Sequence, residues 1–250
     1  MKYFNLDAII SAQPTFQKAP GGFRYGFIPN IFKEDVYDKL VAGFPSSSSF
    51  KLVDKPSGGG RKRFYSGPHY ETDYTGGCVC HLEQLSNIWK EVMKESASAE
   101  LITTLSKATD INFNSLGMFG FAYGDEGCMQ EAHIDGVIRD NPSVIKSPIA
   151  CLIYINKDAE GSSGTRIYNT DRTTTLFKAP GMRNGLFFFE QNINAWHGFP
   201  IVPVGEERRL LSLGYNIEKN PIQFKKSLIH KLICVHGWKF RIKSLLSRTK

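Results

Sequence analysis

The sequence predicts a mainly β protein with helical support, of the α+β class, whose core is a jelly roll or a barrel. Aromatic residues make up 12% of the 250 residues, and 23 glycines supply many turn positions. Aromatic and β-branched side chains pack well on pleated sheets. From residue 116 onward the chain divides into short apolar segments separated by Gly, Asp, Asn and Pro, without helical periodicity between them. Closely spaced short strands of this kind are typical of jelly rolls.

The charge distribution separates a body from a tail. The net charge of +7 comes from 31 basic and 24 acidic residues. Residues 219–250 hold nine of the basic residues and none of the acidic ones, so the first 218 residues have a balance of −2. We expect one domain over 1–218, with helical support over about 1–112 and the β core over about 113–218. A basic amphipathic tail follows over 219–250.

Helices and a loop are predicted before the β core. Residues 31–44, 82–93 and 99–107 each show apolar residues at helical spacing, which predicts amphipathic helices. Such helices cover one outer face of a sheet. The Ser- and Gly-rich stretches at 46–49 and 57–63 predict mobile loops.

Eight short strands make up the predicted core. Each is rich in aromatic or β-branched residues and is bounded by turn-forming residues. They cover residues 116–123, 131–135, 148–156, 165–169, 173–178, 186–190, 195–199 and 209–216.

Metal-ligand residues lie in two of these strands. Side chains two positions apart in a strand point to the same side, so His133 and Asp135 face one ion together. We expect a hairpin formed by residues 186–190 and 195–197 to carry His197 beside them. Two histidines and one carboxylate on a single face are the ligand set of non-haem Fe(II) oxygenases.

The chain resembles the Fe(II)- and 2-oxoglutarate-dependent dioxygenases, most closely their prolyl-hydroxylase-like branch, over roughly residues 116–217. The resemblance is carried by five motifs in order: His133-Ile134-Asp135, the strand from Cys151 to Asp158, the turn and strand from Gly161 to Tyr168, Leu186-Phe187-Phe188-Phe189, and His197 followed by Arg208-Arg209. It implies a double-stranded β-helix, a jelly-roll or cupin-like fold, with the N-terminal helices packed outside. The chain departs from the family's usual Gly-Gly pair, which is Ser163-Gly164 here.

The resemblance also implies the site residues. His133, Asp135 and His197 match the iron ligands and are the expected catalytic centre. A basic residue in the last strand normally pairs with the distal carboxylate of 2-oxoglutarate, and either Arg208 or Arg209 fits this role.

Three further residues match positions that face the cosubstrate. Arg208 is preferred over Arg209 because it shares a strand face with Ser212, whose hydroxyl can reach the same carboxylate. Tyr154 matches the family tyrosine that hydrogen-bonds this carboxylate, and Tyr123 matches a second cosubstrate-facing tyrosine. Each tyrosine is alternatively a core aromatic residue.

The activity implied by the resemblance is hydroxylation of an unactivated carbon, with release of succinate and CO2. The implied cofactors are Fe(II), 2-oxoglutarate and O2, with ascorbate as a further candidate. The substrate class stays open among a small molecule, a glycan, including a lipid-linked cell-surface glycan, and a protein side chain. Arg139, Arg172 and Trp196 flank the expected mouth of the site, and residues 136–147 form a candidate lid.

The sequence also gives expectations about location and partners. The N-terminus lacks the basic start and long apolar run of a secretory signal, and five irregularly spaced cysteines are typical of reduced thiols, so we expect a cytoplasmic protein. The basic tail is a candidate for peripheral binding to the anionic cytoplasmic face of a membrane. It can equally pack on the body or bind an acidic partner.

Two alternative functions stay open. The first is a catalytically inactive double-stranded β-helix that serves as a binding module. The second is a nucleic-acid demethylase, which only the basic tail suggests; the near-neutral body disfavours a nucleic-acid partner.

Overall fold

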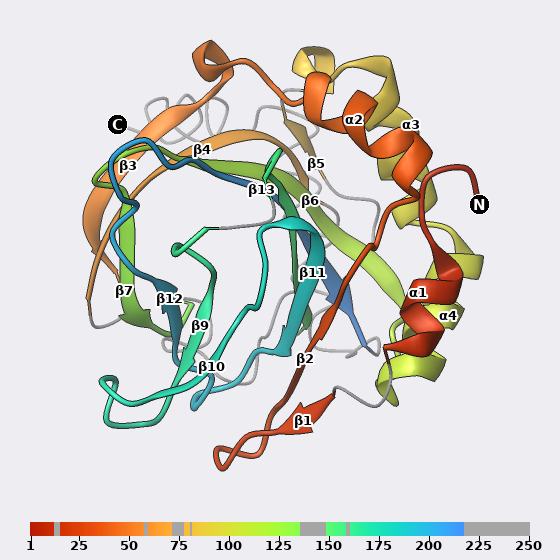
Figure 1. The fold of residues 1–250 in the computed structure, drawn as a ribbon. Helices are drawn as coiled ribbons and strands as arrows, with labels where there is room; N and C mark the ends of the chain where they lie inside the picture. Colours follow the sequence, from red (N-terminus) through yellow and green to blue (C-terminus); the bar gives the residue numbers. More distant parts are fainter. Residues whose placement is uncertain are drawn as a thin grey trace, which may run out of the picture.

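A computed structural model describes residues 1–12, 16–57, 60–71, 78–80, 82–135, 149–158 and 161–217 of the chain. The strands of this part of the chain form one curled antiparallel sheet, and four α-helices lie along one side of it (Figure 1). The helices are α1 (Leu6–Ser11), α2 (Glu34–Ala42), α3 (Asn87–Ser96) and α4 (Ala99–Thr109). The strands are β1 (Gln17–Lys18), β2 (Arg24–Ile28), β3 (Lys51–Ser57), β4 (Gly60–Glu71), β5 (Cys78–Cys80), β6 (Ser115–Gly124), β7 (Met129–His133), β8 (Ile149–Ile155), β9 (Arg166–Tyr168), β10 (Thr175–Lys178), β11 (Arg183–Glu190), β12 (His197–Phe199) and β13 (Arg208–Asn216).

The last eight strands divide into two four-stranded groups, which makes the core a double-stranded β-helix. One group has the order β11-β8-β13-β6, and we call it the major sheet. The other has the order β7-β12-β9-β10, and we call it the minor sheet. β4 pairs with both β6 and β7 and so joins the two groups along one edge. Figure 1 shows the resulting curl, with the minor sheet facing β11 and β13.

This architecture confirms the predicted fold class. Each of the eight predicted strands overlaps one strand of β6 to β13. The three predicted helices correspond to α2, α3 and α4. The sequence pattern succeeds here because each helix has one buried face, which fixes the spacing of its apolar residues, and because the strands are short apolar segments bounded by turn-forming residues.

The region before residue 113 is more β-rich than the sequence indicated. The stretch at 57–63 was predicted to be a loop, but its described part belongs to a long hairpin in which β3 and β4 pair from Lys51↔Ser66 to Ser57↔Gly60. β2 pairs with β11 and covers that edge of the major sheet. The prediction failed because basic and glycine residues hid the alternating pattern of these strands, and because β6 and β7, the other partners of β4, lie far away in the chain.

The expected hairpin between residues 186–190 and 195–197 does not form. β11 pairs with β8 and β2, whereas β12 pairs with β7 and β9. The segment between them therefore crosses from the major to the minor sheet, as jelly-roll connections do. His197 reaches its partners through the pairing of β12 with β7.

The apolar core has two main parts, one on each face of the major sheet. The outer part lies between the sheet and the helices, where Trp89 packs edge-on against Phe32 and Phe121 with ring centroids 6.3 and 5.0 Å away. The inner part fills the space between the two sheets and includes Tyr154 and Phe187. The helices therefore brace the major sheet from outside.

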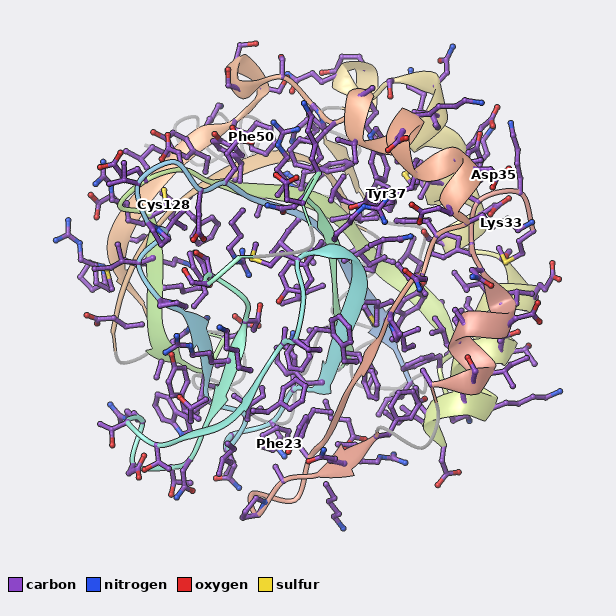
Figure 2. The ribbon with its side chains drawn as sticks, in the orientation of Figure 1. Phe23, Lys33, Asp35, Tyr37, Phe50 and Cys128 are labelled. Carbon is purple, nitrogen blue, oxygen red and sulfur yellow. The ribbon has the colours of Figure 1, made fainter. Side chains whose placement is uncertain are left out.

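Tyr37 attaches α2 to the ends of two strands of the major sheet. Its hydroxyl donates toward the carbonyls of Tyr154 (3.1 Å) and Asn156 (2.9 Å) and accepts from the amide of Asn184 (3.0 Å). Figure 2 labels Tyr37 and shows its side chain directed from the helix toward the sheet. Burial raises the pKa of Tyr37 to about 12, so the hydroxyl stays a donor.

Within the described residues, none of the helices combines the length and hydropathy needed to cross a bilayer. The predicted tail at 219–250 lies outside the described residues, as do Arg139 and the candidate lid at 136–147.

Replacing Trp89 tests how far the helical layer stabilises the sheet. Trp89 is 0% exposed. We expect Trp89→Ala to lower the free energy of unfolding by about 3–5 kcal/mol, because the large cavity cannot collapse fully. Urea denaturation measures this change. Lys94→Ala, an exposed position on the same helix, should shift the free energy by less than about 0.5 kcal/mol.

Candidate metal centre

A β-bulge beside Gly198 sets the geometry of the site. His197 lies opposite His133, and Phe199 lies opposite Gln130, so two residues of β7, 131 and 132, face the single residue Gly198. A Cβ atom at Gly198 would lie 2.2 Å from the carbonyl oxygen of Gln130, so only glycine fits. The extra residue turns Gln130 and His133 to the same side of the strand, the inner side.

The three predicted ligands meet on this inner side. His133 Nε2 lies 3.6 Å and His197 Nε2 lies 3.9 Å from Asp135 Oδ1. The three ligand atoms are all within 4.8 Å of one another. Ligand atoms bound at about 2.0–2.2 Å to one ion have this kind of separation. His133 and His197 are 1% and 8% exposed, while the side chain of Asp135 is 44% exposed, so the site opens toward solvent on the Asp135 side.

Both imidazoles are held with Nε2 directed at the common point. Nδ1 of His133 lies 3.0 Å from the carbonyl of Glu131, and Nδ1 of His197 lies 2.9 Å from the carbonyl of Ala195. A carbonyl can only accept, so each Nδ1 carries the proton and each Nε2 has its lone pair directed inward. The lone pair of His133 Nε2 accepts a hydrogen bond from the side-chain amide of Gln130 (2.9 Å), at the position that a metal ion would take. Backbone carbonyls orient metal-binding histidines in this way.

The electrostatics of the site favour the protonation states that a cation needs. Burial by itself would raise the pKa of Asp135, but the neighbouring His133 and His197 and the more distant Lys62 outweigh it and hold this pKa at about 2. Burial, aided by His133 and opposed by Asp135, lowers the pKa of His197 to about 4. At neutral pH, Asp135 is therefore an anion and His197 is neutral. The donor set fits a divalent ion such as Fe(II) with open positions on its other face.

Arg208 lies on the inner side of β13 and is the second charged feature of the inner face. It is 4% exposed, and no carboxylate among the described residues lies within ion-pair distance of it. Its guanidinium donates to the carbonyl of Ser163 (3.0 Å) and to the hydroxyl of Thr165 (2.9 Å), and it stacks 4.0 Å from the ring of Phe199. Burial lowers the pKa of Arg208 to about 10, which still leaves it charged at neutral pH. A buried cation without a partner is costly, so this position favours a bound anion.

Two of the other predicted cosubstrate residues share this inner side. The ring of Tyr154 lies 5.9 Å from the guanidinium of Arg208, and its hydroxyl accepts a hydrogen bond from the amide of Thr165 (2.8 Å). Ser212 lies four positions beyond Arg208 on the same face of β13. Thr165 was not predicted as a site residue; its position after the Ser-Gly turn was the signal that could have identified it.

Tyr123 and Arg209 lie on the other side of the sheet. Tyr123 packs 5.9 Å from the ring of Phe50 and donates to Glu207 (3.1 Å). Arg209 pairs with Glu207 (2.7 Å) and lies over the ring of Phe44. Their orientation differs from the prediction that they face the cosubstrate. The reason is strand alternation, since Arg209 follows the inward-facing Arg208 directly and Tyr123 pairs with Arg209 across the strands.

Two of the predicted substrate contacts meet on the outer side of the minor sheet. The guanidinium of Arg172 stacks 4.1 Å from the ring of Trp196. Arg172 also lines an open groove of about 640 Å³, together with Tyr168, Ile201 and residues of β7. Trp196 precedes the inward-facing His197 and so lies on the opposite face of β12 from the metal ligands.

The depressed pKa of His197 predicts a pH dependence of stability for the metal-free protein. The unfolded chain takes up a proton near pH 6.5, whereas the folded protein does so only near pH 4. The free energy of unfolding should therefore fall as the pH drops through this window, by roughly 1 kcal/mol per pH unit from this residue at most. Urea denaturation at pH 7 and pH 5 should show a smaller fall for His197→Asn than for the wild type. Equal falls would show that His197 is not held neutral.

Comparison with solved structures finds this fold among oxygenases. An oxidoreductase of the 2OG-Fe(II) oxygenase family from Burkholderia pseudomallei aligns with a TM-score of 0.56 at 12% sequence identity, over 86% of this chain and 92% of that one. A Pseudomonas putida prolyl-4-hydroxylase aligns with a TM-score of 0.54 at 11% identity, over 86% of this chain and all of that one (100%). No protein-family model and no curated protein matches the sequence. The chain therefore shares the double-stranded β-helix fold of these oxygenases.

Proposed function

We propose that the protein is an Fe(II)- and 2-oxoglutarate-dependent dioxygenase that hydroxylates an unactivated carbon of its substrate. One observation carries the proposal: a two-histidine, one-carboxylate cluster and a buried arginine, which has no acidic partner among the described residues, lie on the same inner side of a double-stranded β-helix. The cluster alone would suit several metals. The arginine adds a position for the far carboxylate of a keto acid.

The residues of the chain have distinct tasks in this function. His133, Asp135 and His197 hold the ion, and the carbonyls of Glu131 and Ala195 fix the direction of the two imidazoles. Bound Fe(II) and 2-oxoglutarate supply the activation of O2, with release of succinate and CO2 and hydroxylation of a substrate carbon.

The residues around Arg208 position the keto acid. Arg208 binds its distal carboxylate, and Thr165, Tyr154 and Ser212 provide hydroxyl groups near this position. Phe199 lies against the guanidinium and limits the access of water to it. A water-poor pocket strengthens the ion pair that would form there.

The candidate substrates are a small molecule, a glycan and a protein side chain. The shared fold with a prolyl-4-hydroxylase makes a peptidyl proline the first protein substrate to test. Ascorbate is included in such assays as a candidate reductant. The intact ligand set supports an enzyme over an inactive binding module, and the near-neutral first 218 residues support substrates other than nucleic acid.

We also propose a cytoplasmic location, with residues 219–250 binding peripherally to anionic membrane. The excess of basic residues in this stretch supports it. Deleting 219–250 should abolish co-sedimentation with phosphatidylserine vesicles, and unchanged binding would contradict this role.

Replacing Arg208 and Arg209 separately by methionine tests which of the two arginines binds the distal carboxylate of the keto acid. We expect Arg208→Met to weaken 2-oxoglutarate binding about 100-fold, equivalent to about 2.7 kcal/mol, because a charge-assisted contact is lost in a buried site. Anaerobic titration of the Fe(II) protein, followed by its charge-transfer absorption, measures the dissociation constant. The matched control Arg209→Met, on the outer face, should change it less than about threefold. Equal effects of the two changes would refute the assignment of Arg208.

Removal of a metal ligand tests the enzymatic proposal directly. His133→Ala should abolish succinate release in the presence of Fe(II), 2-oxoglutarate and substrate extracts, because two ligands on a partly exposed site hold the ion too weakly. His69→Ala, a histidine of β4 that is not part of the cluster, serves as the control. Full turnover by His133→Ala would exclude the proposed metal centre.

A further inference from the structure

Two lysines face each other across the β3–β4 hairpin. Lys55 pairs with Lys62 in the register of the two strands. Directly opposed side chains of an antiparallel pair have Cβ atoms about 4.5–5.5 Å apart, so like charges there repel each other. Lys55 is exposed and Lys62 is half-buried, which leaves Lys62 less screened by water.

The other charges of the hairpin are paired on its opposite face. Asp54 contacts the guanidinium of Arg61 at 2.9 Å and that of Arg63 at 4.0 Å. Strand alternation directs these three side chains away from Lys55 and Lys62. Among the described residues, no carboxylate lies within ion-pair distance of either lysine. The two lysines therefore form a positively charged position that no ion pair with a described carboxylate neutralises.

This positive position lies beside the metal centre. Lys62 is the cross-strand neighbour of Gln130, and the side-chain amide of Gln130 lies 2.9 Å from Nε2 of His133. The bulge in β7 turns Gln130 to the inner side, so its strand neighbour Lys62 faces the same side. Asp135 is close enough for the charge of Lys62 to act on its carboxyl group.

Aromatic rings separate this position from the keto-acid position. The ammonium of Lys62 lies 5.7 Å from the ring of Phe64, which packs against the cluster that contains Phe199. Phe199 in turn stacks on Arg208. The two cations therefore lie on different sides of an apolar wall. A keto acid held by Arg208 and the metal leaves Lys62 free for another anion.

We propose that Lys55, Lys62 and Gln130 form a substrate subsite that holds an anionic group, a carboxylate or a phosphate, next to the metal centre. The inference rests on the proposed oxygenase function and narrows its substrate class to molecules that carry such a group near the oxidised carbon. Lys62 supplies the main positive charge of the subsite. Lys55, which is exposed, adds a second positive charge at its solvent side, and the side-chain amide of Gln130 donates a hydrogen bond to the anionic group.

The test uses inorganic phosphate and acetate as probes of the full-length protein loaded with Mn(II) and 2-oxoglutarate. Mn(II) enhances the nuclear relaxation of an anion held close to it, so the ³¹P signal of phosphate and the methyl ¹H signal of acetate report binding. Titration of each probe gives its dissociation constant. Electron paramagnetic resonance of Mn(II) and retention of 2-oxoglutarate on a desalting column check the loading of every variant.

We expect Lys62→Gln to weaken probe binding about tenfold, equivalent to about 1.4 kcal/mol. Lys62→Arg should retain binding, and Lys55→Gln, at an exposed position that does not endanger folding, should weaken it about threefold. The control Lys39→Gln removes the same charge from the exposed surface of α2 and should have no effect. An effect on one probe alone identifies that anion as the preferred group.

Unchanged dissociation constants in both Lys62→Gln and Lys55→Gln would overturn the subsite while leaving the oxygenase proposal intact, provided that Mn(II) and 2-oxoglutarate bind. Failure of the wild-type protein to bind Mn(II) or 2-oxoglutarate would overturn both. Weaker phosphate or acetate binding together with an unchanged dissociation constant for 2-oxoglutarate would support an anion position distinct from that of the keto acid.

Discussion

The pairing of β12 with β7 is the interaction on which the candidate site depends. It places His197 directly opposite His133, and the bulge next to this pair gives the inner face its set of polar side chains. Gly198 makes the bulge possible, because its backbone lies against the carbonyl of Gln130 with no room for a side chain. A shift of one residue in this register would turn His197 away from the cavity.

The inner side of the β-helix combines groups that are costly to bury without ligands. Two imidazoles and a carboxylate converge there, and Arg208 is buried without an acidic partner among the described residues. Such arrangements lower the stability of a protein in the absence of ligands and are retained where binding repays the cost. A metal ion and a dicarboxylate would compensate the charges of both groups.

The helical layer stabilises the half of the barrel that carries Arg208. Tyr37 joins α2 to the end of β8, and the side chain of Asn156 just beyond this end accepts a hydrogen bond from the amide of Arg209. The start of β13, where Arg208 lies, is thereby linked to the helices through a short chain of hydrogen bonds. The minor sheet has no such helical cover among the described residues (Figure 1). The helices hold the major sheet rigid, and the minor sheet is left without such cover in the part of the chain that the structure describes. This arrangement suits a site in which one ligand is bound firmly and a second ligand can enter.

The sequence by itself determined the eight strands of the core and the metal-ligand candidates. Each strand is a short apolar segment bounded by turn-forming residues, and the His-x-Asp spacing keeps two ligands close together although Asp135 lies just beyond the end of β7. It also identified Arg208 through its position after His197, and it left the choice between Arg208 and Arg209 open. Alternation on β13 makes Arg208 the inward-facing residue, but a single bulge would have reversed this.

Only the tertiary structure decided which strands are neighbours. The local pattern suggested a hairpin between residues 186–190 and 195–197, whereas the two strands lie in different sheets and His197 meets His133 through β7. The β3–β4 hairpin, of which residues 57–63 were predicted to be a loop, lies at an edge of the site and brings Lys62 beside Gln130. The pairs His133–His197 and Lys62–Gln130 join residues more than 60 positions apart, and their energy comes from burial and strand pairing that no local sequence window contains.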